Sequence, residues 1–150
     1  MPLPIPAQRY LRTISMYHFS KTLPVGFDEA IALVTAALSQ EGFGILTEID
    51  AQAAFKKKLG ADFRRYTILG ACHPQIAHAM LQLDDKAGVL YPCNVVVQEY
   101  DDGRVEVSAI DPLAMFAAIP DPQARVIAQE ASQKMQMVMA QLPAATPVAV

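Results

Sequence analysis

A strand hairpin in the second half of the chain limits the fold more than any other feature. Residues 90–100 are the most β-prone stretch, with three consecutive valines at 95–97. An Asp-Asp-Gly turn follows at 101–103, and its glycine supplies the positive φ that a tight turn needs. In residues 104–110, alternate apolar side chains share one face. The two strands should therefore be antiparallel neighbours, and any sheet that contains them is at least partly antiparallel.

The rest of the chain alternates between helix and strand signals. The helix at 27–40 is the clearest, because Phe27, Ile31, Val34 and Leu38 recur at helical spacing and form one apolar stripe. The other predictions are strands at 12–19, 43–49 and 65–72, and helices at 51–59, 74–83, 112–118 and 122–142. The order β-α-β-α-β-α-β-β-α-α predicts a single α+β domain. We expect one mostly antiparallel or mixed sheet of about five strands with helices packed on it.

Three segments divide the chain. Residues 1–11 contain the run PLPIP, which cannot enter a helix, so we expect an extended proline-rich arm there. Residues 12–119 are expected to form the α+β core, and residues 120–150 a C-terminal amphipathic helix with a frayed tail. A chain of 150 residues that is 53% hydrophobic suits one domain with a real core.

Charge and apolar pattern limit the partners. The formal net charge is −3, which argues against a nucleic-acid partner because a phosphate backbone needs a basic face. No run reaches the roughly 18 apolar residues that a membrane-spanning helix requires, and the first residues do not resemble a signal peptide. We therefore expect a cytoplasmic protein with no membrane partner, whose two cysteines stay reduced.

Cys72, His73 and Cys93 form the candidate site, because thiols and imidazole bind soft metals and two thiols can form a redox pair. Their spacing fits no zinc signature. If the two cysteine-bearing strands are antiparallel neighbours, both sulfurs lie at one end of the sheet; if the strands are parallel, about 20 Å separates them. A helix starting at Pro74 would lower the pKa of Cys72. Alternatively, both cysteines are small buried hydrophobic residues, or one of them lines a ligand pocket.

The sequence contains no motif for catalysis or for a cofactor. It has no nucleophile elbow, phosphate loop or dinucleotide fingerprint. Asp50, Asp111 and Asp121 precede predicted helices and are expected to cap them. We therefore assign no catalytic residue and infer no cofactor.

Several motifs resemble a known family. GFGILTEID after a helix, ACHP between a strand and a helix, and LYPCNVVVQEYDDGRVEVSAIDP are similar to the bacterial and archaeal domain-of-unknown-function family numbered 302. The resemblance runs from about residue 12 to residue 119 and leaves the proline arm and the final helix as additions. It implies a compact α+β domain that pairs into dimers, and no known reaction. His73 stands where the family pattern commonly has asparagine, so it is a poorer helix cap or has another role.

Two functions are therefore predicted. The favoured one is a small cytosolic binding or interaction module that forms a homodimer and has no catalysis of its own. Its other partner would be a small molecule or a metal ion. The alternative is a thiol- or soft-metal-dependent protein, for metal binding or for sulfur and redox handling, centred on Cys72, His73 and Cys93.

Overall fold

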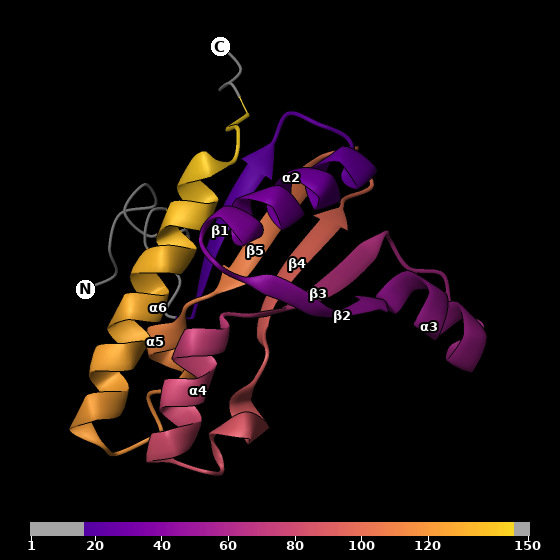
Figure 1. Ribbon diagram of the computed structural model, residues 1–150. Coiled ribbons are helices and arrows are strands. Elements are labelled where there is room, and N and C mark those ends of the chain that lie inside the picture. The colour runs from indigo at the N-terminus through magenta and orange to yellow at the C-terminus, as the bar shows by residue number, and fades with distance from the viewer. Residues whose placement is uncertain (1–16, 146–150) are drawn as a thin grey trace, which may run out of the picture.

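One antiparallel sheet organises the computed structural model, which describes residues 17–145 (Figure 1). Its strands are β1 (His18–Leu23), β2 (Gly44–Asp50), β3 (Tyr66–Cys72), β4 (Cys93–Glu99) and β5 (Val105–Ile110). They lie in the order β1-β5-β4-β3-β2, and each neighbouring pair is antiparallel. The predicted α+β class and the predicted order of elements are confirmed.

The helices begin at residues that suit a helix start. They are α2 (Phe27–Gln40), α3 (Ala51–Leu59), α4 (Pro74–Leu83), α5 (Pro112–Met115) and α6 (Pro122–Gln141), with a 3₁₀ turn η1 (Ala87–Leu90) before β4. The carboxylates of Asp50, Asp111 and Asp121 accept backbone N–H bonds of 2.8–3.0 Å at the starts of α3, α5 and α6. The predicted capping role of these aspartates is confirmed.

The predicted hairpin is present as β4 and β5. Val97 lies opposite Val107, and the Tyr100 N–H donates to the Arg104 carbonyl across the turn. Gly103 has a φ of +87°, the left-handed conformation that favours glycine. Because β4 pairs with β3 as well, the hairpin lies in the middle of the sheet.

The first strand differs from its prediction. It was expected at residues 12–19, of which residues 12–16 lie outside the described range; β1 contains residues 18–19 and runs on to Leu23, through residues expected to form a connection. The backbone of β5 supplies its partner, with Leu23 opposite Val105. Tertiary pairing thus extends a segment with weak strand propensity of its own. Residues 1–16 and 146–150, which include the proline arm and the end of the tail, lie outside the described range.

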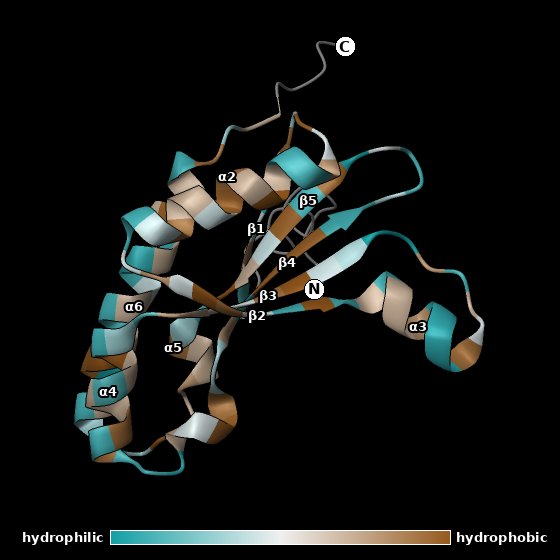
Figure 2. Cartoon of the chain, turned by 45° about the vertical axis from the view of Figure 1, so that its right-hand side comes forward, coloured by the Kyte–Doolittle hydropathy of each residue, from teal (hydrophilic) through white to brown (hydrophobic). Residues whose placement is uncertain are grey.

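Two apolar clusters hold the elements together. The larger lies between the sheet and the helices α2 and α6, and it includes Val95, Val97 and Val107. The smaller joins α4, η1, α5 and α6 beyond the end of the sheet. Figure 2 shows α3 apart from the other helices, and α3 buries only Ala51. Across residues 17–145, no helix combines the length and the hydropathy needed to span a membrane.

Candidate functional site

Side chains alternate between the two faces of each strand, and α2 and α6 cover one face only. On the covered face, Leu69, Val95 and Val97 are fully buried. We call the opposite side the open face. Its cross-strand rows are Tyr66–Gln98–Glu106–Thr22 and Ile68–Val96–Ser108–Ser20, with Ile110 opposite His18 further along.

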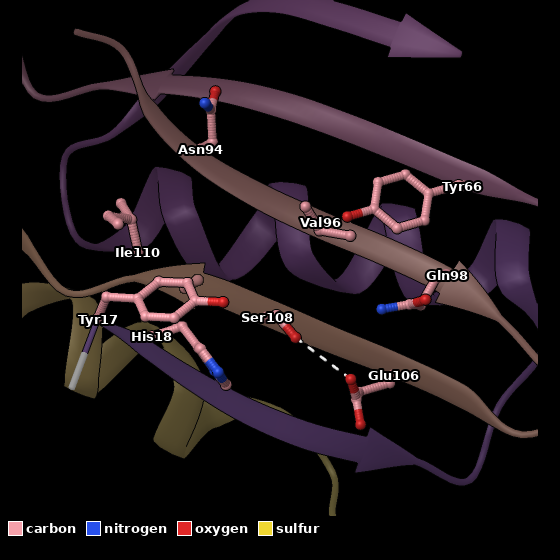
Figure 3. Close-up of a pocket in the computed structure, with 10 residues that line it drawn as sticks. Tyr17, His18, Tyr66, Asn94, Val96, Gln98, Glu106, Ser108 and Ile110 are labelled. Carbon is pink, nitrogen blue, oxygen red and sulfur yellow. Dashed lines mark hydrogen bonds between the residues drawn. The ribbon is translucent and has the colours of Figure 1, made fainter. Parts of the chain in front are cut away.

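A hollow of about 310 Å³ lies on the open face (Figure 3). Most of the residues that line it are polar or aromatic. The full lining consists of Tyr17, His18, Tyr66, Asn94, Val96, Gln98, Glu106, Ser108, Ala109 and Ile110. A concave surface with some apolar lining and a few fixed polar groups is typical of a site for a small organic ligand.

A chain of hydrogen bonds runs along one side of the hollow. His18 Nδ1 lies 2.7 Å from Ser20 Oγ, and Ser20 Oγ lies 2.8 Å from Ser108 Oγ. The Ser108 hydroxyl donates to Glu106 Oε1 at 3.4 Å, and the Tyr100 hydroxyl donates to the same oxygen at 3.3 Å. The steps from His18 to Glu106 follow from strand geometry, since Ser20 is directly opposite Ser108 and the His18–Ser20 and Ser108–Glu106 links join residues two apart.

The number of protons available determines which group donates at each of these hydrogen bonds. An ionised carboxylate only accepts, and each serine hydroxyl has one proton to donate. Since Ser108 donates to Glu106, Ser20 must donate to Ser108, and His18 Nδ1 must donate to Ser20. A neutral His18 then carries its proton on Nδ1, and its Nε2 is left as a hydrogen-bond acceptor.

Gln98 is oriented from the other side of the hollow. Its Oε1 accepts from Arg64 Nε at 2.9 Å, so the side-chain NH₂ is directed away from Arg64, and Figure 3 shows that nitrogen toward the hollow. Because Arg64 Nε–H can only donate, this assignment of the amide is chemically required. Arg64 also lies over the rings of Phe63 and Tyr66, at 4.5 and 5.8 Å from their centres.

Charges of both signs meet at the Glu106 end. Glu106 is the one ionisable acid in the lining, while the guanidinium groups of Arg64 and Arg104 lie over the Tyr100 ring, at 5.4 and 4.3 Å. Burial raises the pKa of Tyr100, and the charge and hydrogen bond of Glu106 raise it further. The two arginines lie outside the lining, so Glu106 is the one acidic side chain that faces the hollow without a basic residue beside it in the lining.

The structure places the two predicted cysteines at one end of the sheet but on opposite faces. Ala71 is directly opposite Cys93, so Cys72, the next residue, points to the other side. Cys93 is buried in the main core, with its thiol 3.9 Å from the Met115 sulfur. Burial, with a smaller effect of Cys72, raises the pKa of Cys93 to about 12.

Cys72 is half-buried on the open-face side, and burial raises its pKa as well. The helix that begins at Pro74 was predicted to lower that pKa, so the direction is opposite to the predicted one. Burial of the thiol disfavours the charged thiolate and is the cause of the rise. Tyr91 lies between both apolar clusters near the two thiols, and its buried hydroxyl has no hydrogen-bond partner among the described residues.

His73 caps α4. Its Nδ1 accepts from the Ile76 N–H at 3.4 Å, a long bond that agrees with the expectation of a poorer cap than asparagine. The ring packs edge-on against Phe43, at 5.4 Å between centres, and Gly42 leaves room for it. Burial lowers the pKa of His73; Lys134 lowers it further, whereas Glu130 raises it.

The described part of the chain contains no group of three or more His, Cys, Asp or Glu side chains that could hold a metal ion. The structure brings Cys72 and Cys93 to the same end of the sheet, while His73 is buried against Phe43. A role for these three residues in metal or thiol chemistry stays a prediction.

Sequence reasoning missed the open-face residues. The signal was present, because Asn94 and Gln98 alternate with the inward valines of β4, as Glu106 and Ser108 do in β5. Alternation predicts that such side chains face outward. It does not predict that β1 would place His18 and Ser20 beside them.

Together, these features define the class: an α+β domain whose antiparallel sheet has helices on one face and a polar hollow on the other. The sequence model described as "Domain of unknown function DUF302" matches residues 19–142. The chain belongs to this family, as its motifs predicted. The final helix, which the resemblance left outside the family core, lies within the matched range.

A solved structure supports the assignment. The fold is similar to the crystal structure of an uncharacterised conserved DUF302 protein from Bacillus stearothermophilus, with a TM-score of 0.78 and 26% sequence identity. The alignment covers 85% of this chain and 99% of that one. No curated protein matches the chain. Family and fold are thus shown, and neither carries a known reaction or ligand.

Proposed function

We propose that this chain is a cytoplasmic, non-catalytic binding module that holds a small organic molecule in the open-face hollow. The observation that carries the proposal is the fixed polar lining. Ser108, Glu106 and Gln98 are each held by hydrogen bonds to neighbouring strands or loops before any ligand arrives. A site whose polar groups are already oriented loses less entropy when it binds.

The apolar part of the lining supports an organic ligand rather than an inorganic ion. Val96 and Ile110 are half-buried. Figure 3 shows Val96 between Asn94 and Gln98 on β4, and Ile110 on the neighbouring strand at the Asn94 end of the hollow. Tyr17 and Tyr66 add aromatic rings at the two ends. Flat apolar groups can pack against such side chains while polar atoms reach the strand residues around them.

Three simple probes test this function. Phenol, benzamide and benzoate are each added to the full chain at millimolar concentration, and NMR spectra are recorded. We expect shifts of the Val96 and Ile110 methyl signals with at least one probe. Val96→Phe should abolish these shifts because the larger ring fills the hollow, and phenylalanine suits a strand. The matched control is Val89→Phe in η1, since Val89 is 85% exposed and lies away from the hollow. If no probe shifts open-face signals, the proposed function is wrong.

A second proposal is self-association through β2 and α3. β2 is the last strand in the sheet order, so one of its edges has no strand partner among the described residues. Leu46 and Ile49 on β2 and Leu59 on α3 are 68%, 50% and 73% exposed. An unpaired edge beside exposed apolar residues is a template for pairing, and a second copy can add its own β2 under two-fold symmetry.

Sedimentation velocity tests this homodimer. We expect Ile49→Lys to shift the wild-type dimer toward monomer, because a charge at the paired edge is costly. Val89→Lys is the control with the same charge change away from the edge. A wild-type chain that is monomeric at high concentration would overturn the proposal.

A further inference from the structure

We propose that the ligand of the hollow is a ring-containing molecule without negative charge, with a hydrogen-bond acceptor at one end and a donor at the other. This inference rests on the proposed binding function and adds the chemical class of the ligand. Hydrogen bonds within the protein carry it, because the Arg64–Gln98 bond and the chain from His18 to Glu106 set which pocket atoms donate and which accept.

The donor end of the hollow belongs to Gln98. Its carbonyl oxygen is occupied by Arg64 Nε, so the NH₂ group is what remains to contact a ligand. Gln98 is only 8% exposed, which restricts its side chain to this arrangement. A ligand must therefore place an acceptor, such as an amide or ketone oxygen, near Gln98.

The acceptor end belongs to His18. The chain through Ser20 and Ser108 to Glu106 holds the imidazole proton on Nδ1. His18 Nε2 has no hydrogen-bond partner among residues 17–145 and is free to accept. A ligand must therefore place a donor, such as a hydroxyl or N–H, near His18.

The two ends of the hollow lie on different strands. Gln98 lies on β4 in the row of Thr22, and His18 is four residues from Thr22 along β1, with β5 between the two strands. Their separation has a component of about 13 Å along the strands, at about 3.3 Å per residue, and one of about 10 Å across two strand spacings. A ligand that contacts both ends passes over Val96, which lines the hollow between them and can pack against a benzene ring.

Charge disfavours an anionic ligand. Glu106 is the one acidic side chain in the lining and would repel an anion. Arg64 and Arg104 do not line the hollow, and Arg64 is engaged by Gln98 and by aromatic rings, so neither arginine offsets Glu106.

Matched probes test the inference by NMR titration at pH 8, where imidazoles are mostly neutral. 4-Hydroxybenzamide has the predicted acceptor at its amide end and a hydroxyl donor at the opposite end, while 4-methoxybenzamide lacks that hydroxyl donor. We expect the first to bind about fivefold more tightly, the value of one hydrogen bond. His18→Phe should remove this preference, and His78→Phe on the exposed side of α4 should keep it. Gln98→Glu should weaken both amides, because a carboxylate cannot donate.

Equal affinity for the two amides, with both contacting Val96, would overturn the ligand class and leave the binding function standing. A second measurement needs no ligand. The ring ¹⁵N shifts of His18 should place the proton on Nδ1 in the wild type, and Ser108→Ala should move part of the population to Nε2. A proton on Nε2 in the wild type, or no change with Ser108→Ala, would overturn the orientation that the hydrogen-bond chain gives.

Discussion

The covered face and the open face of the sheet are built from the same strands but differ in nearly every property. In β4, Val95 and Val97 are fully buried under the helices, whereas Val96 between them faces the hollow. In β5, Val107 is buried while Ser108 joins a chain of hydrogen bonds. The covered face therefore determines stability, and the open face is free to carry a site.

The largest effect should come from a charge on the covered face. Val97→Asp would bury an unpaired carboxylate, and we expect a loss of more than about 4 kcal/mol in the free energy of unfolding. Val96→Asp, one residue away on the open face, should cost about 1 kcal/mol or less because water can reach the new group. Urea denaturation of both variants measures the difference. Similar losses would show that the open face is packed like the core.

The two cysteines give a comparison by chemical reactivity. Iodoacetamide attacks the thiolate, and the Cys93 thiol has a pKa of about 12 and is 3% exposed. Cys72 is half-buried, and burial raises its pKa as well. At pH 8 we expect Cys72 to react faster, because its thiol is more accessible than that of Cys93. Mass spectrometry of the two cysteine peptides measures both rates in one sample, and equal rates would contradict the burial of Cys93.

Gly70 marks the place where the open face is closely packed. A Cβ there would overlap the Thr47 hydroxyl and lie 2.7 Å from Pro92 Cγ. We expect Gly70→Ala to cost about 2 kcal/mol in thermal or chemical unfolding. Adding Thr47→Ala should recover part of the loss. Gly44→Ala at the same end of the sheet is the control, because no atom lies within 4 Å of its Cβ position.

The smallest effect concerns two tyrosine hydroxyls. The Tyr91 hydroxyl is buried without a partner in the described range, so Tyr91→Phe should stabilise the fold by about 1 kcal/mol. Tyr66→Phe on the open face should change stability by less than about 0.5 kcal/mol, because that ring is half-buried beside the hollow. A loss of stability in Tyr91→Phe would show that its hydroxyl has a partner after all.

Local signals explain which parts of the fold were predictable. The apolar stripe of α2, the turn at 101–103 and the capping aspartates act over a few residues, and the structure contains them as predicted. The predicted first strand ended at Phe19, short of Leu23, because the continuation of β1 depends on β5, which lies more than eighty residues away. Strand propensity alone does not report such a partner.

The candidate site shows most clearly which features the sequence determines and which the tertiary structure determines. The sequence alone determined the family, the order of elements, the hairpin and the alternation that turns Asn94, Gln98, Glu106 and Ser108 away from the valines. Tertiary structure decided that Ser20 meets Ser108, and that Cys72 and Cys93 lie on opposite faces. The physical reason is register: a shift of one residue moves every side chain of a strand to the other face, and the packing of the whole sheet sets it.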